Sequence, residues 1–118
     1  VNEIFEDIIG VTLYEDSPIY QIYFWVSDLS KDYVATKPLH ESQKQIGGSK
    51  ELEFRNTYAW LNGGQIFRID CKYNYELIRE LSSFGKDLLV LSPKEIQNKV
   101  KCRLDEMVHE YQKLQTDI

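Results

Sequence analysis

The sequence has few of the residues that form disulfide frameworks or metal centres. Its 118 residues include two cysteines, Cys71 and Cys102, and two histidines, His40 and His109. These four residues never fall at close ligand spacings, and a zinc site needs about four converging ligands. We therefore expect two free thiols, no metal and no cofactor.

Basic charge is also scarce. Fourteen lysines and arginines stand against nineteen acidic residues, which gives a net charge of −5. A domain that grips a phosphate backbone normally has clustered basic residues and a basic isoelectric point. The basic residues here are scattered, so we do not expect this chain to bind nucleic acid directly.

Long apolar runs and targeting signals are missing too. No stretch approaches the roughly 18 apolar residues of a membrane helix. The segment Val1 to Glu6 lacks the basic and apolar regions of a signal peptide. The chain does not begin with Met, so we expect it to start after processing or inside a longer protein. These observations predict a soluble, cytoplasmic module with no membrane partner.

What is present begins with an alternating strand. Residues 1–18 hold an apolar segment and a polar turn, and we interpret them as a lead-in arm to a single domain at 19–118. From Tyr20 the sequence alternates with period two, which is typical of a strand. The alternation gives two faces: Tyr20, Ile22, Phe24 and Val26 on one, and Gln21, Tyr23, Trp25 and Ser27 on the other.

A short helix and two further extended segments follow. Ser27 is a candidate N-cap, and the helix should end near Lys37 because Pro38 follows it. Leu29, Tyr33 and Val34 would lie in this helix. Residues 39–46 predict a polar strand, at an edge of the sheet or facing solvent. The segment 52–61 alternates weakly and precedes Asn62-Gly63, a hairpin signal, so we interpret it as a strand-like arm.

The second half has clearer signals. Residues 65–73 predict a strand with Phe67, Ile69, Cys71 and Tyr73 on one face. Asn74 can cap the next helix, and Gly85 suits its C-terminal end. Residues 88–91 form an apolar run that is typical of a buried central strand. Ser92-Pro93-Lys94-Glu95 then begins a long helix with one apolar stripe. The stripe comprises Ile96, Val100, Leu104, Met107, Val108, Tyr111 and Leu114.

The order of elements predicts an α+β, ferredoxin-like β-α-β-β-α-β sheet with an inserted hairpin arm and an extra long C-terminal helix. Both crossover helices should cover one face of the antiparallel sheet. Tyr23 and Trp25 would lie on the other face, which needs cover from the final helix, the 51–61 insertion or a partner. We favour the final helix.

Several segments carry short motifs in a set order. Thr36 to Gln43 contains K-P-L-H-x-S-Q, Asn74-Tyr75-Glu76-Leu77 is followed by Ser83-Phe84-Gly85, and Leu91-Ser92-Pro93 precedes the last helix. Together with Phe5 to Val11, these segments resemble the C-terminal extension of bacterial WYL-type transcriptional regulators, from about residue 5 to residue 114. That family has a stretch like Phe5 to Val11 after its WYL domain, an R-P-L-H-x-S-Q strand in which arginine stands in place of this lysine, an N-x-E-L…S-x-G helix and a V-L-x-P motif.

The resemblance implies a function. Such regulators have an N-terminal winged helix-turn-helix, a Sm-like WYL domain and a ferredoxin-like extension that supports dimerisation and effector sensing. The chain would be this extension alone. The resemblance also implies its partners, which are the upstream WYL and helix-turn-helix domains and a second copy of the regulator. DNA would be bound only through the missing N-terminal domain. The segment 47–63 departs from the family, which has a short turn there.

The candidate contact residues are polar and aromatic. Lys37, His40, Ser42 and Gln43 form either a soluble edge strand bonded to its neighbours or a contact surface for an effector or the WYL domain. His40 and Ser42 would share one strand face. Tyr23 and Trp25 form either ordinary core or a docking surface. These six residues are the predicted site.

No pattern points to catalysis. Cys71 lies on an apolar strand face without an activating base, and Gly48-Ser49-Lys50 lacks the rest of a phosphate loop. We expect a non-enzymatic module. Two alternatives remain open: an RNA-recognition-like domain that stacks bases on sheet aromatics, and a small-molecule-sensing ferredoxin-like domain.

Overall fold

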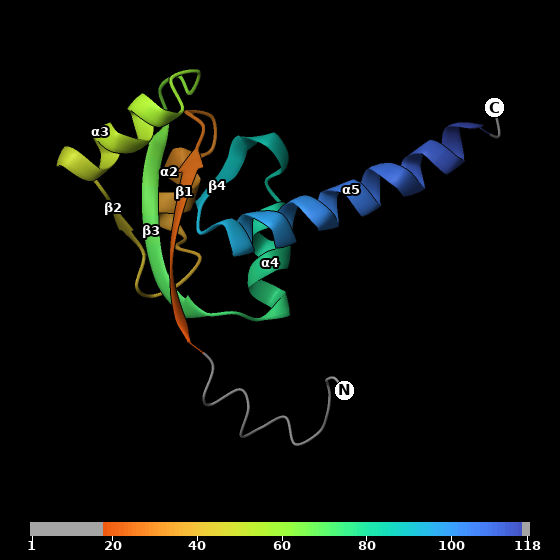
Figure 1. Ribbon diagram of the computed structural model, residues 1–118, viewed down its shortest axis with the longest axis horizontal. Coiled ribbons are helices and arrows are strands. Elements are labelled where there is room, and N and C mark those ends of the chain that lie inside the picture. The colour runs from red at the N-terminus through yellow and green to blue at the C-terminus, as the bar shows by residue number, and fades with distance from the viewer. Residues whose placement is uncertain (1–17, 117–118) are drawn as a thin grey trace.

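A computed structural model describes residues 18–116, so all of the predicted lead-in arm at 1–18 except residue 18 lies outside the described residues. Within this described part, four strands form one antiparallel sheet (Figure 1). They are β1 (Ile19–Val26), β2 (Lys44–Gln45), β3 (Gln65–Lys72) and β4 (Leu88–Ser92), in the order β2-β3-β1-β4. The prediction of an α+β fold with an antiparallel sheet and a long last helix is confirmed.

Helices connect the strands. They are α2 (Lys31–Thr36), α3 (Gly48–Thr57), α4 (Tyr75–Ser82) and α5 (Lys94–Thr116), with a 3₁₀ turn at Gly85–Asp87. The side chain of Asn74 accepts a 2.8 Å hydrogen bond from the backbone N–H of Leu77, which confirms the predicted N-cap of α4. Gly85 has a φ of 60° and follows α4 closely, as its predicted role requires.

The alternation of β1 sorts its side chains onto two faces, as predicted. One face forms the main core, in which Ile22, Phe24 and Val26 are fully buried. Side chains from β3 and β4, one residue of α2, and α4 with the start of α5 complete it. Phe24 and Phe67 stack at its centre with ring centroids 5.7 Å apart. Both α2 and α4 therefore cover the same face of the sheet.

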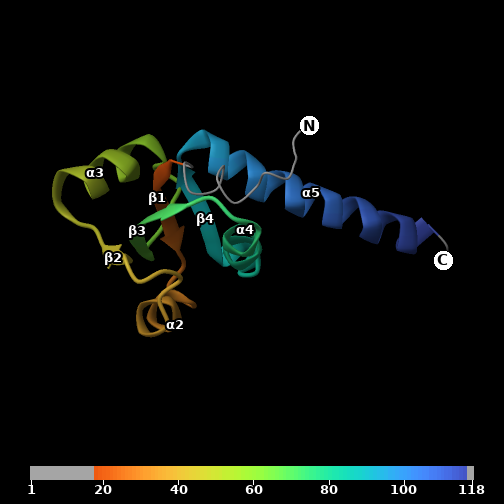
Figure 2. The same cartoon turned by 90° about the horizontal axis from the view of Figure 1, so that it is seen from below.

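The other face carries a smaller core. Its buried members are Trp25, Phe54, Leu61, Ile66 and Leu91. Phe54 belongs to α3, which crosses the sheet on the side away from α2 (Figure 2). The cover for this face is therefore the inserted segment, and the expectation that the final helix covers Tyr23 and Trp25 is wrong.

The inserted segment is also the main error in the predicted elements. Residues 48–57 form a helix and not a strand-like arm, and Asn62-Gly63 leads into β3 without a hairpin. The sequence of α3 has good helix formers, and ion pairs join Lys50 to Glu53 and Glu51 to Arg55. Phe54 is its only buried side chain, so the sequence gives no apolar stripe to reveal the helix.

Three smaller predictions are wrong. Ser27 does not cap α2, which begins at Lys31; its hydroxyl instead donates to Asp87 at 2.9 Å. The predicted strand at 39–46 reduces to Lys44–Gln45, because a turn occupies residues 39–42. The run at 88–91 forms an edge strand and not a central one, because among residues 18–116 β4 pairs with β1 alone.

Candidate functional site

The polar loop before β2 is bonded to its own domain. Ser42 Oγ lies 2.7 Å from His40 Nδ1, and the Ser42 backbone N–H donates to the same nitrogen at 3.1 Å. The Ser42 hydroxyl also donates to the Asp70 carbonyl at 3.1 Å and accepts from the Asp70 N–H at 2.8 Å. The structure therefore brings His40 and Ser42 together, through a turn and not through a shared strand face.

Gln43 bonds the same loop to α2. Its side-chain amide donates to the Val34 carbonyl at 3.0 Å, and its amide oxygen accepts from the Leu39 N–H at 2.9 Å. Lys37 lies apart from this arrangement, with its ammonium 5.7 Å from the centroid of the Tyr33 ring. Three of the four polar residues of the predicted site thus meet in one loop, and each of the three makes bonds within the domain.

The two aromatic residues of the predicted site lie beneath α3. The Tyr23 ring centroid is 5.1 Å from that of Phe54, and Lys50 lies 5.3 Å above the Tyr23 ring. Trp25 is 8% exposed, and its indole N–H donates to the Gly63 carbonyl at 3.1 Å. The arrangement leaves little of the Trp25 ring free for stacking on a ligand.

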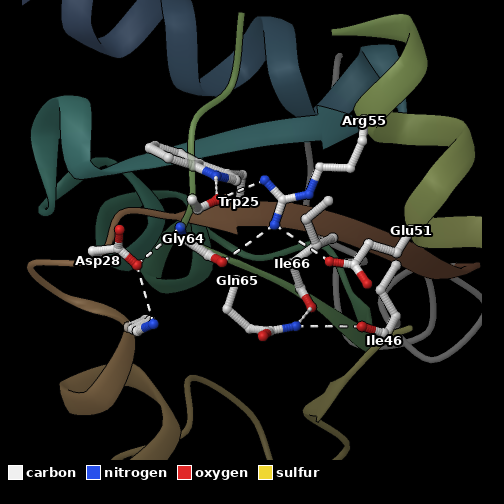
Figure 3. Close-up of polar contacts among 10 residues, drawn as sticks. Trp25, Asp28, Ile46, Glu51, Arg55, Gly64, Gln65 and Ile66 are labelled. Atoms are coloured by element: carbon white, nitrogen blue, oxygen red, sulfur yellow. Dashed lines mark hydrogen bonds and ion pairs between the residues drawn. The ribbon is translucent and has the colours of Figure 1, made fainter. Parts of the chain in front are cut away.

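A group of polar contacts that sequence reasoning missed fixes α3 to the sheet (Figure 3). Arg55 donates to the carbonyls of Gly63 and Gly64 at 2.6 and 3.2 Å, and Glu51 lies 3.3 Å from its guanidinium. Asp28 accepts a 3.0 Å hydrogen bond from the Gly64 N–H. In the sequence, the one sign of these contacts is the glycine pair Gly63-Gly64. In the structure, both glycines have a positive φ.

We call the contacts of Arg55 and Asp28 with Gly63 and Gly64 the latch. An ion pair adds to it. Asp28 lies 3.0 Å from the Lys31 ammonium. That contact, followed by the hydrogen bond from Gly64, holds the pKa of Asp28 below its usual value. The latch therefore joins α3 and the turn before β3 to the end of β1, since Asp28 and Gly64 are 36 residues apart in sequence.

The second half of α5 extends beyond the body of the domain (Figure 1). We define its apolar side chains as the tip stripe: Met107, Val108, Tyr111 and Leu114, which are 50 to 63% exposed. These residues continue the stripe whose first members, Ile96 and Val100, are buried in the main core. Among the described residues, nothing covers the tip stripe as the body covers the start of α5.

An apolar groove lies between β4 and α5, and we call it the β4 groove. It has a volume of about 620 Å³. Its lining includes Tyr58, Trp60, Leu89, Lys101 and Leu104. Trp60 is 67% exposed and so presents most of its ring to solvent. Apolar surface thus runs from this groove, past Leu104, onto the tip stripe.

No three of the described His, Cys, Asp and Glu side chains lie close enough together to hold a metal ion. Burial raises the pKa of the Cys71 thiol, which favours its unreactive protonated form. Across residues 18–116, no helix is long and apolar enough to cross a membrane.

The described residues thus form an α+β module with two exposed apolar surfaces and a loop bonded to its own domain. The family model of the WCX domain matches residues 18–108, which is most of the chain. The chain belongs to the WCX family, the C-terminal domain of WYL-containing regulators. A comparison with curated proteins found no match.

Proposed function

We propose that this chain is the regulatory and pairing module at the C-terminal end of a bacterial DNA-binding transcriptional regulator. In this role it braces the upstream WYL domain or transmits its sensing of an effector, and it joins two copies of the regulator. DNA binding then belongs to an N-terminal helix-turn-helix, in keeping with the net charge of −5 on this chain.

The observation that carries the proposal is the tip stripe. The body of the domain buries Ile96 and Val100 but not the four apolar residues of the tip stripe. In a monomer, these four exposed side chains add no buried apolar surface. An exposed apolar surface of this kind typically marks an interface with another protein. The family match supports a setting in which such partners exist: other domains of the same regulator and its second copy.

The strand order allows a more specific fold than α+β to be proposed. The order β2-β3-β1-β4 places the first and third strands at the centre, and α2 and α4 share one face. We propose that this is a ferredoxin-like sheet in which α3 is inserted between β2 and β3. The insertion covers the face that an RNA-recognition-like domain would use, which favours a protein partner over single-stranded RNA.

The proposed function includes no catalysis and no cofactor. The proposed function is tested by measuring whether the chain associates with a second copy and with the WYL domain. Sedimentation velocity of the 118-residue chain, over a wide concentration range, should detect a dimer. Titration with the separately produced WYL domain of the same regulator should detect a complex. A chain that stays monomeric at the highest concentration and also ignores the WYL domain would contradict the proposal.

A further inference from the structure

Charge divides α5 into two halves. Residues 94–103 carry four basic side chains and one acidic one, whereas residues 104–116 carry three acidic side chains and one basic one. The basic residues are Lys94, Lys99, Lys101 and Arg103, and the acidic residues of the second half are Asp105, Glu106 and Glu110. The first half lies against the body of the domain, and the second half projects from it (Figure 1).

This distribution opposes what an isolated helix prefers. The helix macrodipole favours acidic residues near the N-terminus and basic residues near the C-terminus. Here the projecting half has most of the acidic residues. Lys101–Asp105 and Glu110–Lys113 pairs offset part of this within the helix, at 2.8 and 3.1 Å. Exposed pairs of this kind contribute little, so the segregation of charge has no evident benefit to the single chain.

The segregation becomes favourable when two such helices run in opposite directions. The acidic half of each then lies beside the basic half of the other. The apolar spacing agrees, because Leu104, Met107, Tyr111 and Leu114 are separated by steps of three, four and three residues, which is the repeat of helices that pack against each other. A two-fold dimer requires a surface that is complementary to itself, and α5 has this property only in the antiparallel sense.

We infer that the partner of the tip stripe is a second copy of this chain, with the two α5 helices packed antiparallel across a two-fold axis near Leu104. Leu104 lines the β4 groove and is half-buried. Leu114 lies ten residues further, about 15 Å along the helix. The projecting half of each copy therefore reaches along the β4 groove of the other. The inference deepens the pairing part of the proposed function and rests on it.

The groove and the stripe have matching chemistry. The groove presents Trp60 and Leu89, and its lining also includes the ion pair of Lys101 and Asp105. The stripe supplies Tyr111 and Leu114, with Glu110 beside them. Large aromatic and aliphatic side chains in an apolar groove, with charged residues at the rim, are typical of protein interfaces. Each copy offers one stripe and one groove, so the dimer would fill both surfaces without leaving either exposed.

The test uses two charge-reversed variants of the 118-residue chain. In the first, Lys99→Glu and Lys101→Glu make both halves of α5 acidic. In the second, Glu106→Lys and Glu110→Lys make both halves basic. We expect each variant alone to dimerise at least about tenfold more weakly than the unaltered chain in sedimentation velocity at low salt. An equimolar mixture should recover the dimer, because both antiparallel contacts become complementary again.

The controls separate this inference from the proposed function. Charge reversal elsewhere, in the pair Glu41→Lys and Glu53→Lys, should leave dimerisation unchanged. A chain ending at Asp105 should be monomeric while circular dichroism shows its fold retained. If the unaltered chain dimerises and neither charge variant nor the truncation weakens it, the antiparallel α5 pairing is wrong and the pairing role stands on another surface. If the unaltered chain is monomeric throughout, the antiparallel pairing and the pairing role are both wrong, and only the bracing role survives.

Discussion

The side chain of Ser42 replaces a strand partner for Asp70: its hydroxyl bonds both the N–H and the carbonyl of that residue, at 2.8 and 3.1 Å. The backbone pairing of β2 with β3 includes only Lys44↔Arg68 and Gln45↔Phe67. One hydroxyl thus extends a two-residue strand by another position. His40 Nδ1 lies 2.7 Å from the same oxygen.

Ser42→Ala removes both hydrogen bonds and leaves two half-buried backbone groups of Asp70 without them. We expect a loss of about 1–3 kcal/mol in the free energy of unfolding. Urea unfolding followed by circular dichroism measures it. Ser49→Ala, on the exposed first turn of α3, is the matched control and should change stability by less than about 0.5 kcal/mol. Equal effects from the two substitutions would show that the Ser42 bonds contribute nothing.

The cover over the second face depends on one side chain. Phe54→Ala deletes the only buried residue of α3 and leaves Tyr23 and Trp25 without their covering ring. We expect a loss of about 3 kcal/mol and a shift of tryptophan fluorescence toward the exposed value. Leu52→Ala, two residues away and 59% exposed, should alter neither. An unshifted spectrum in Phe54→Ala would mean that α3 does not shield Trp25.

Much of this architecture could be predicted because its determinants are local. The alternation of β1 between Tyr20 and Val26 and the capping of α4 by Asn74 each depend on neighbouring residues. The helix α3 could not be predicted, because its only buried residue, Phe54, is one apolar contact in ten residues and produces no periodic stripe. The apolar run of β4 was misplaced at the centre of the sheet, since burial by helices at an edge gives the same composition.

The sequence predicted only part of the loop around His40, because only the local part of its contacts is encoded by neighbouring residues. That His40, Ser42 and Gln43 belong together follows from their spacing. Their partners do not follow from it, because Ser42 bonds the backbone of a residue 28 positions away and a backbone group leaves no mark in a sequence. The Arg55 latch likewise binds the carbonyls of two glycines.

Gly64 is required where the latch meets the sheet. Its φ is 68°, and a Cβ there would overlap the Val26 carbonyl oxygen and lie 2.6 Å from Trp25 Nε1. Gly64→Ala should therefore destabilise the fold by more than the roughly 1 kcal/mol expected of backbone conformation alone. Gly85→Ala is the matched comparison, because Gly85 has a φ of 60° but open space around its Cβ position. Thermal unfolding of both variants should place Gly64→Ala well below Gly85→Ala; the reverse order would contradict the packing argument.

Asp28 gives the latch a dependence on pH. Lys31 and then the Gly64 N–H lower its pKa in the folded chain. A lowered folded pKa means that the ionised carboxylate stabilises the fold above its unfolded pKa of about 3.9, and that this contribution disappears as the pH falls through the lower folded value. Asp28→Asn should therefore unfold at a lower temperature than the unaltered chain near neutral pH, and the gap should close in strong acid. Glu41→Gln, exposed on a turn, should show no such convergence.

The two thiols should differ sharply in reactivity. Cys71 is buried on the core face of β3, and burial raises its pKa, whereas Cys102 lies on an exposed face of α5. Because the thiolate is the reactive form, a chromogenic disulfide reagent should modify one thiol quickly and the other only when the chain unfolds. Cys102→Ser should remove the fast phase, and Cys71→Ser should preserve it. Fast modification of folded Cys102→Ser would show that β3 opens to solvent, contrary to the packing of the main core.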